Sequence, residues 1–301
     1  MTLILTLVTR SASALKLAAA APGGLGAAKE SAGKTWCVAM RPIESGRQPD
    51  LTAYLQAEAP GFQADWAITP DANRRKRLLI SDMDSTIIGQ ECLDELADFA
   101  GLKAQVSAIT ERAMRGELDF ASALTERVAM LKGLDLSALE ACYSQRVTLN
   151  PGARALIATM KEHGARCVLV SGGFRFFTSR VAKAAGFDVD RANTLIDDGK
   201  ALTGEVGQPI LGREAKLAAL RDEAAALGLT SIDAVALGDG ANDLDMIRAA
   251  GLGVAYKAKP IVAAETMARI EFTDLTAALF FQGYREDEIA SGHQADPNRF
   301  T

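Results

Sequence analysis

From residue 78 to residue 255, short apolar stretches alternate with longer amphipathic ones, and this alternation restricts the possible folds more than any other feature of the chain. The apolar stretches are residues 78–81, 167–170, 234–237 and 253–255. They are too short for helices and carry no alternating polar residues, as is typical of parallel strands buried on both faces. The sequence therefore predicts an α/β fold, with a parallel sheet covered by helices on both faces.

Glycines follow the segments between these strands, which have helical periodicity. The predicted helices span residues 153–162, 174–185, 214–227 and 244–250. A glycine just beyond a helix commonly adopts the left-handed conformation that ends it. We expect that role for the following residues: Gly164, Gly186, Gly228 and Gly251.

The chain divides into three parts by the character of its sequence. Residues 1–73 predict a small α+β module, which begins with a core strand at residues 3–8 rather than a leader peptide. Residues 74–290 predict the main α/β domain. Within it, residues 91–149 show helical patterns alone, which predicts a helical insertion at about residues 90–149. Residues 291–301 predict a disordered tail.

Composition excludes several classes of protein. Lys and Arg total 33 against 38 Asp and Glu, a net charge of −5, so nucleic-acid binding is not expected. The basic run at residues 74–77 is interpreted as a solvated entry to the first strand. No apolar stretch reaches the ~18 residues of a membrane span. The four cysteines (Cys37, Cys92, Cys142 and Cys167) are far apart, which predicts reduced thiols and a cytoplasmic location.

Acidic side chains follow the first strand of the predicted sheet. Asp82 and Asp84 are two residues apart on an extended chain, so both are expected to face one pocket. Two such close carboxylates repel each other unless a proton or a cation separates them, and Mg2+ prefers carboxylate oxygens. A surface turn is the alternative. A calcium loop is not favoured, because Leu93 stands where its twelfth-position Glu would be.

Two more strand ends carry polar residues. Ser171, Gly172 and Gly173 follow the second strand, and they form either an anion cradle or an ordinary turn. The third strand is followed by three further oxygen-bearing residues, Asp239, Asn242 and Asp243. These residues either bind a metal or cap a helix. Because parallel strands bring their carboxyl ends to one edge of a sheet, a metal shared with the first strand is favoured.

The chain resembles the haloacid dehalogenase superfamily of phosphohydrolases in several motifs taken together. These are the segments DMDSTIIGQECLDEL, VLVSGGF and LGDGANDLDM, with Lys216 between the last two. The resemblance covers about residues 77–290. Within that superfamily the chain is most similar to the phosphoserine phosphatases. This similarity rests on Glu91, Arg127 and the residues of the SGGF and GDGAND motifs.

The resemblance implies a chemistry for the main domain. Asp82 would be a nucleophile that forms an aspartyl-phosphate, and Asp84 would act as general acid and then general base. Mg2+ would be held by Asp82, by the main-chain carbonyl of Asp84 and by Asp239. The phosphoryl oxygens would be held by the residues Ser171, Gly172 and Lys216, with Asn242 assisting and Gly173 and Asp243 in support.

The resemblance also implies a substrate. The insertion would be a cap, in which Glu91 binds the ammonium and Arg127 the carboxylate of O-phospho-L-serine, with Met114 and Phe120 as an apolar wall. The product would be L-serine, at the last step of its biosynthesis. Residues 1–73 would be a degenerate ACT-like domain that contributes to a homodimer. Two alternatives stay open. One is a phosphatase or phosphotransferase of the same superfamily that acts on another small phosphomonoester, and the other is a catalytically silent binder of a phosphorylated metabolite.

Overall fold

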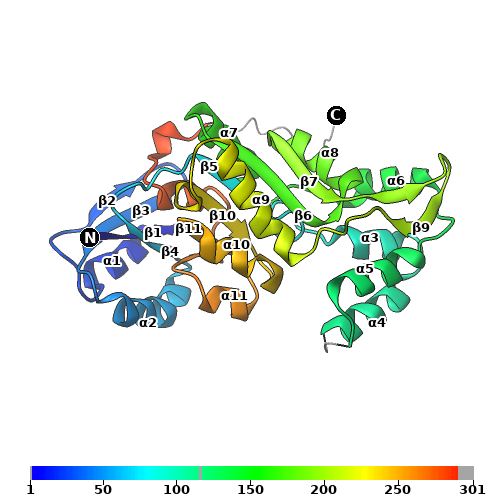
Figure 1. The fold of residues 1–301 in the computed structure, drawn as a ribbon. Coiled ribbons are helices and arrows are strands. Elements are labelled where there is room, and N and C mark those ends of the chain that lie inside the picture. The colour runs from blue at the N-terminus through cyan, green and yellow to red at the C-terminus, as the bar shows by residue number, and fades with distance from the viewer. Residues whose placement is uncertain (1, 115–116, 291–301) are drawn as a thin grey trace.

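The computed structural model describes residues 2–114 and 117–290, with only the main chain of Ala113 and Met114. The described residues build a ten-stranded sheet in the order β2-β3-β1-β4-β12-β11-β10-β5-β6-β7 (Figure 1). Its parallel part consists of β5 (Leu78–Ser81), β6 (Arg166–Phe174), β7 (Val189–Asn193), β10 (Ala234–Gly238), β11 (Leu252–Tyr256) and β12 (Ala268–Ile270). The predicted α/β architecture is confirmed. The predicted tail at residues 291–301 lies outside the described residues.

Both faces of the parallel sheet are buried, as its continuous apolar strands predict. Successive residues point to opposite faces, so that Leu79 packs into one core while Leu78 and Ile80 pack into another. Helices cover the first core, namely α7 (Ala153–Glu162), α8 (Arg175–Ala185) and α12 (Ala277–Phe281). The second core lies under α9 (Arg213–Ala226) and α10 (Leu244–Ala249).

The glycines that follow these helices have two different roles. Gly164, Gly186 and Gly228 adopt positive φ angles of 81°, 97° and 64°, as predicted for helix ends. The prediction for Gly251 is wrong, because its φ is not positive. At Gly251 a side chain is excluded by space instead: a Cβ atom there would collide with the carbonyl oxygen of Ile232.

The helical insertion is present and forms a separate lobe, at the right in Figure 1. It consists of α3 (Cys92–Phe99), α4 (Lys103–Met114), α5 (Phe120–Ala129) and α6 (Leu136–Arg146). A hairpin of β8 (Leu195–Asp197) and β9 (Leu202–Val206), which the sequence analysis did not predict, packs against it. The Gly133 N–H donates to the Leu202 carbonyl at 2.8 Å, so the cap contains a second segment of the chain.

The N-terminal module has interleaved strands. Its elements are β1 (Leu3–Thr9), α1 (Lys16–Ala20), β2 (Lys29–Ala32), β3 (Cys37–Ile43), α2 (Gln48–Glu58) and β4 (Asp65–Pro70). The antiparallel order β2-β3-β1-β4 is that of a ferredoxin-like βαββαβ unit. A 3₁₀ helix at Ala12–Leu15 leads directly into α1. A relation to ACT domains stays a prediction.

The strands of the module extend the sheet of the main domain. Strand β4 pairs antiparallel with β12, with Ala67 opposite Ala268. Beside this pairing, the buried Asp65 carboxylate accepts hydrogen bonds from the main-chain N–H groups of residues 271–273 at 2.7–3.0 Å, and from the Thr273 hydroxyl. Strand pairing and one buried carboxylate therefore join the two parts.

The basic run at residues 74–77 is only half solvated, so its interpretation as a solvated strand entry is wrong for Arg74 and Lys76. The Arg74 Nη2 donates to the Thr6 hydroxyl at 2.9 Å, and the buried Lys76 Nζ donates to two main-chain carbonyls at 2.8 Å. Arg75 and Arg77 are exposed as predicted. These two inward cations help to hold the N-terminal module and the main domain together.

Two other observations concern the whole described chain. All four cysteines are buried and unpaired. Among the helices of residues 2–114 and 117–290, none has both the length and the apolar character needed to cross a bilayer.

Candidate active site

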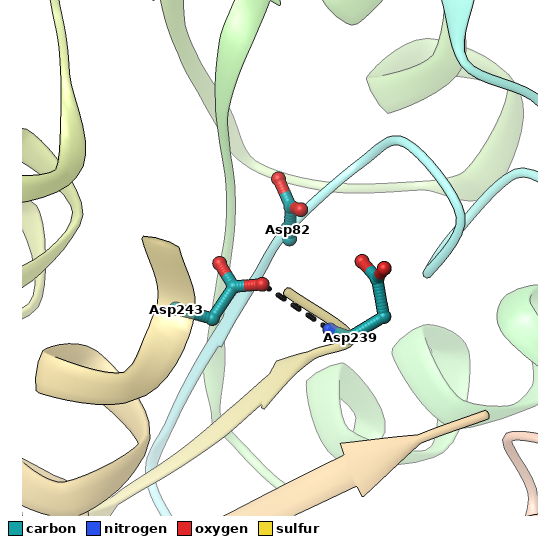
Figure 2. Close-up of side chains that lie close together, drawn as sticks. All are labelled: Asp82, Asp239 and Asp243. Atoms are coloured by element: carbon teal, nitrogen blue, oxygen red, sulfur yellow. Dashed lines mark hydrogen bonds between the residues drawn. The ribbon is translucent and has the colours of Figure 1, made fainter. Parts of the chain in front are cut away.

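Two neighbouring strand ends bring three acidic side chains to one point. Asp82 follows β5, and its N–H donates to the Leu237 carbonyl on β10 at 3.0 Å. Asp239 and Asp243 follow β10. One oxygen from each of these three carboxylates lies within 4.8 Å of the others (Figure 2). A group of carboxylate oxygens with this spacing is a set of ligands suited to a hard divalent cation.

A buried lysine holds two of these carboxylates. The Lys216 Nζ lies 2.7 Å from an Asp82 oxygen and 2.6 Å from an Asp243 oxygen, and the Lys216 side chain is 2% exposed. Burial raises the pKa of Asp82 well above its usual value, and the Asp243 charge adds to this effect, while Lys216 opposes it. Burial alone would lower the pKa of Lys216, but the two carboxylates raise it. Lys216 therefore stays protonated against Asp82.

Both oxygens of Asp243 already have donors. One oxygen accepts from Lys216, and the other accepts from the Asp239 and Gly240 N–H groups at 3.2 and 3.0 Å. The side chain packs so closely on Gly238 that a Cβ at that position would overlap it. Asp243 is thus suited to orienting Lys216, and Asp82 and Asp239 retain free lone pairs for a cation.

Asp84 faces a different neighbour from Asp82. One of its oxygens accepts from the Cys92 N–H at 2.9 Å, and the other accepts from the Ser171 hydroxyl at 3.1 Å. Burial raises the pKa of Asp84 to about 6, with a contribution from the Glu91 charge. A carboxyl group that titrates near neutral pH can both give and take a proton, as a general acid–base requires.

The cap closes over these strand ends. Glu91 and Arg127 line the same pocket as Asp82 and Asp84, and the Ser85 hydroxyl donates to Glu91 at 2.7 Å. The Phe120 ring packs against the main chain of Gly172 in β6, so that a Cβ atom at Gly172 would lie 2.9 Å from the ring. The pocket has a volume of about 140 Å³, below the usual range for drug-sized ligands, so its occupant is a small molecule.

The structure brings together nearly all of the residues predicted for the site. Lining the pocket are Asp82, Asp84, Glu91, Phe120, Arg127, Ser171, Gly172, Gly173, Asp239 and Asn242. Lys216 and Asp243 lie behind Asp82, as its buried partners. The side chain of Met114, predicted as part of the apolar wall, lies outside the described residues.

Lys259 lines the pocket as well, although the sequence analysis did not identify it. It follows β11, and its N–H donates to the Asp239 carbonyl at 3.0 Å. The rule that found Asp82 and Asp239, polar residues at the end of a buried strand, would also have found Lys259 had it been applied to this fourth strand.

Asn193 is a second unpredicted residue, at the end of β7. Its amide group donates to the Gly172 carbonyl at 2.8 Å and to the Leu211 carbonyl at 3.1 Å, and its oxygen accepts from the Leu211 N–H at 2.7 Å. Asn193 is 2% exposed. It therefore joins the irregular part of β6 at Gly172 to the loop that precedes α9, the helix of Lys216.

Replacing Asn193 with Asp is expected to keep the acceptor for Leu211 and remove both donors. Because the main chain of β6 at Gly172 then loses its support, we expect kcat/KM for phosphate-ester hydrolysis to fall about tenfold and inhibition by inorganic phosphate to weaken in parallel. Steady-state kinetics and phosphate inhibition measure this effect. Gln282→Glu, which removes the same donor from another buried amide outside the pocket, is the control. Unchanged phosphate inhibition in Asn193→Asp would limit Asn193 to a structural role.

Comparison with known proteins decides the family. A model of the haloacid dehalogenase-like hydrolases matches residues 79–248, which include every one of the strand ends described above except that of β11. The chain belongs to the haloacid dehalogenase-like hydrolases. The resemblance inferred from the motifs is thereby confirmed.

Individual relatives agree with the family. The chain is 46% identical over 218 residues to a phosphoserine phosphatase of Polaromonas sp., a match that covers 70% of this chain and 92% of the relative. A match to a phosphoserine phosphatase of Streptomyces coelicolor, at 43% identity, covers 79% of this chain but only 58% of that longer protein.

Solved structures share the fold. A crystal structure of a family hydrolase from Salmonella enterica superposes with a TM-score of 0.86 at 31% identity, over 96% of this chain and 99% of that one. The similarity therefore includes most of the N-terminal module. A phospho-aspartyl intermediate analogue of a phosphoserine phosphatase superposes with a TM-score of 0.63 at 39% identity, over 69% of this chain and 99% of that one.

Proposed function

We propose that the chain is a Mg2+-dependent phosphoserine phosphatase, which hydrolyses O-phospho-L-serine to L-serine and phosphate at the last step of serine biosynthesis. The observation that carries the proposal is that Glu91 and Arg127 both line the pocket of Asp82 and Asp84. A carboxylate and a guanidinium in the wall of one pocket match the two charges of an amino acid. The names of the relatives point to the same substrate.

The donor set fits the metal. Asp82 and Asp239 would offer carboxylate oxygens, and Asp84 its main-chain carbonyl, which together are the hard ligands that Mg2+ prefers. When bound, the ion would offset the repulsion between an anionic nucleophile and an anionic phosphate.

In the first step, an Asp82 oxygen attacks phosphorus while the bond from phosphorus to the serine oxygen breaks. The Asp84 carboxyl group gives its proton to the departing serine oxygen. Lys216, ion-paired with Asp82 at 2.7 Å, keeps the nucleophile oriented. Its ammonium group and the Ser171 hydroxyl donate hydrogen bonds to the phosphoryl oxygens. The product of this step is an aspartyl-phosphate on Asp82.

In the second step, the Asp84 carboxylate takes a proton from a water molecule, and the oxygen of that water attacks phosphorus. The bond between phosphorus and the Asp82 oxygen breaks, which releases phosphate and restores both carboxyl groups. A pKa of about 6 at Asp84 places both of its protonation states within reach near neutral pH.

Binding of the amino-acid end would set specificity. The Arg127 guanidinium can meet a carboxylate through two parallel hydrogen bonds, and Glu91 can accept from the ammonium group. Phe120, which packs over Gly172, would keep water from the phosphoryl group until the leaving serine has gone.

Phosphate release from a panel of small phosphomonoesters, with Mg2+ and then with EDTA, tests the proposal. We expect turnover that needs the metal and is fastest on O-phospho-L-serine. Metal-dependent turnover that is fastest on another compound would keep the chemistry and reject the substrate. If the protein releases phosphate from none of these phosphomonoesters, the alternative of a catalytically silent binder is favoured.

Arg127→Ala is expected to separate substrate recognition from chemistry. Loss of a bidentate charged contact predicts about a hundredfold fall in kcat/KM for O-phospho-L-serine, whereas turnover of an aryl phosphate without a carboxylate stays within about threefold. Arg146→Ala, which removes another arginine from the cap, is the matched control. Equal losses on the two substrates would exclude Arg127 from specificity.

Two further proposals accompany this function. A cytoplasmic enzyme is consistent with four unpaired thiols. A homodimer formed through residues 1–73 would appear as twice the chain mass in sedimentation equilibrium.

A further inference from the structure

A second cavity, of about 130 Å³, lies between the N-terminal module and the catalytic domain. Residues of α2 and of α11 (Pro260–Ala264) line it. Figure 1 shows these two helices, in blue and in orange, near each other at the bottom. Most of its wall is apolar, from side chains such as Leu55, Pro60, Ala258 and Ala263. Its volume equals that of about four water molecules in the liquid, enough for a short organic molecule.

One charged side chain in this cavity, Arg269, forms no hydrogen bond or ion pair with any described residue. The Nε of Arg269, on β12, is buried and makes no hydrogen bond to any described residue. The guanidinium carbon lies 5.1 Å from the ring centre of Trp66, opposite it on β4. Burial lowers the pKa of Arg269, and no carboxylate opposes that effect. By contrast, the half-buried Arg191 meets both Asp222 and Glu223.

The two carboxylates that also line this cavity do not neutralise Arg269. The oxygens of Asp65 are used by the main-chain N–H groups of residues 271–273. Glu271 is exposed at the rim and forms no ion pair with Arg269 among the described residues. A partly desolvated guanidinium without a counter-charge is costly, and an anion that enters the cavity would remove that cost.

We propose that this cavity is a binding site for a small aliphatic monocarboxylate, whose carboxylate group pairs with Arg269 and whose hydrocarbon body lies against the alanine and leucine side chains. A guanidinium is shaped for a carboxylate, because it offers two parallel donors. A phosphate dianion fits less well, since a single cation would face two negative charges while Asp65 and Glu271 repel them.

The cavity borders the active site through one short segment, residues 255–259. Ala255 and Ala258 line the cavity, whereas Lys259 lines the catalytic pocket and donates its N–H to the Asp239 carbonyl. A ligand that packs against Ala258 therefore restrains the main chain next to Lys259. The inference concerns a site that the proposed phosphatase chemistry does not use, and its test does not depend on turnover.

Isothermal titration of the full chain with butyrate tests the site. We expect saturable binding of one butyrate per chain, and at least about tenfold weaker binding to Arg269→Met, which keeps an unbranched stem over Trp66 and removes the charge. Arg285→Met, which removes an exposed, ion-paired arginine outside the cavity, should bind as the parent protein does. Inorganic phosphate should bind to this site at least about tenfold more weakly than butyrate.

A second variant keeps the test valid if Arg269→Met does not fold. Ala263→Leu adds bulk at the cavity wall and should abolish butyrate binding while Arg269 remains. Hydrogen exchange provides the link to the active site: butyrate should slow exchange of residues 255–259 in the parent protein and not in either variant.

Several results would overturn the proposal. These are the absence of saturable binding, equal affinity in Arg269→Met, or phosphate binding here as tightly as butyrate. Loss of butyrate binding in Arg127→Met but not in Arg269→Met would place the carboxylate in the catalytic pocket instead.

Discussion

Asp82→Asn is expected to reduce phosphate release by at least about 10⁴-fold, because an amide cannot attack phosphorus or carry the phosphoryl group. The fold should survive the change. The asparagine has nearly the same shape, and Lys216 keeps its ion pair with Asp243 at 2.6 Å. Because the aspartate is a desolvated charge, its removal should leave the unfolding temperature unchanged or raise it.

Rapid quenching with labelled substrate measures the intermediate directly. The parent protein should retain label that is stable in acid and released by hydroxylamine, as expected of an acyl phosphate, and Asp82→Asn should retain none. Asp222→Asn, an exposed aspartate paired with Arg191, is the matched control. Labelling of Asp82→Asn at the parent level would place the nucleophile elsewhere.

The second large effect concerns stability. Asp65→Ala is expected to lower the free energy of unfolding by about 3 kcal/mol, because three main-chain N–H groups and the Thr273 hydroxyl lose a common charged acceptor. Urea denaturation followed by circular dichroism measures the change. Asp71→Ala, at an exposed aspartate just after β4, should change stability by less than about 0.5 kcal/mol.

A loss below about 1 kcal/mol in Asp65→Ala would mean that water replaces the carboxylate at residues 271–273. Strand pairing and the contacts of Arg74 and Lys76 would then hold the module to the catalytic domain. Since Asp65 is far from the phosphoryl pocket in the sheet order, residual activity in the folded fraction should be close to that of the parent.

The sequence was sufficient to predict the catalytic strand ends because the information there is local. Each of Asp82, Ser171 and Asp239 follows a continuous apolar strand, and such strands are recognisable without knowledge of their neighbours. A parallel sheet then dictates that these ends meet. The same rule extends to β11, which Lys259 follows, but not to the strand of Asn193, which has no continuous apolar run.

Other parts depend on contacts distant in the sequence. Strand β7 is a half-buried edge strand with the sequence VDRAN, and β12 has only three residues, so neither has an apolar pattern long enough to identify. The inward course of Arg74 and Lys76 depends on acceptors near residues 6, 232 and 281, which no local pattern reveals. From sequence alone, a run of charged residues is predicted to be exposed to solvent, because its distant hydrogen-bond partners are not known.

The pairing of β4 with β12 has a consequence for the order in which the protein can fold during synthesis. Strand β4 is complete once residue 70 has been made, but its partner across Ala67 arrives only with residue 268. Until then the nascent module presents an open strand edge with unpaired main-chain N–H and C=O groups, which is the kind of surface that pairs with other chains. Any mutation that slows completion of the later strands would therefore show itself first as aggregation on the ribosome, through a part of the chain that contains no catalytic residue.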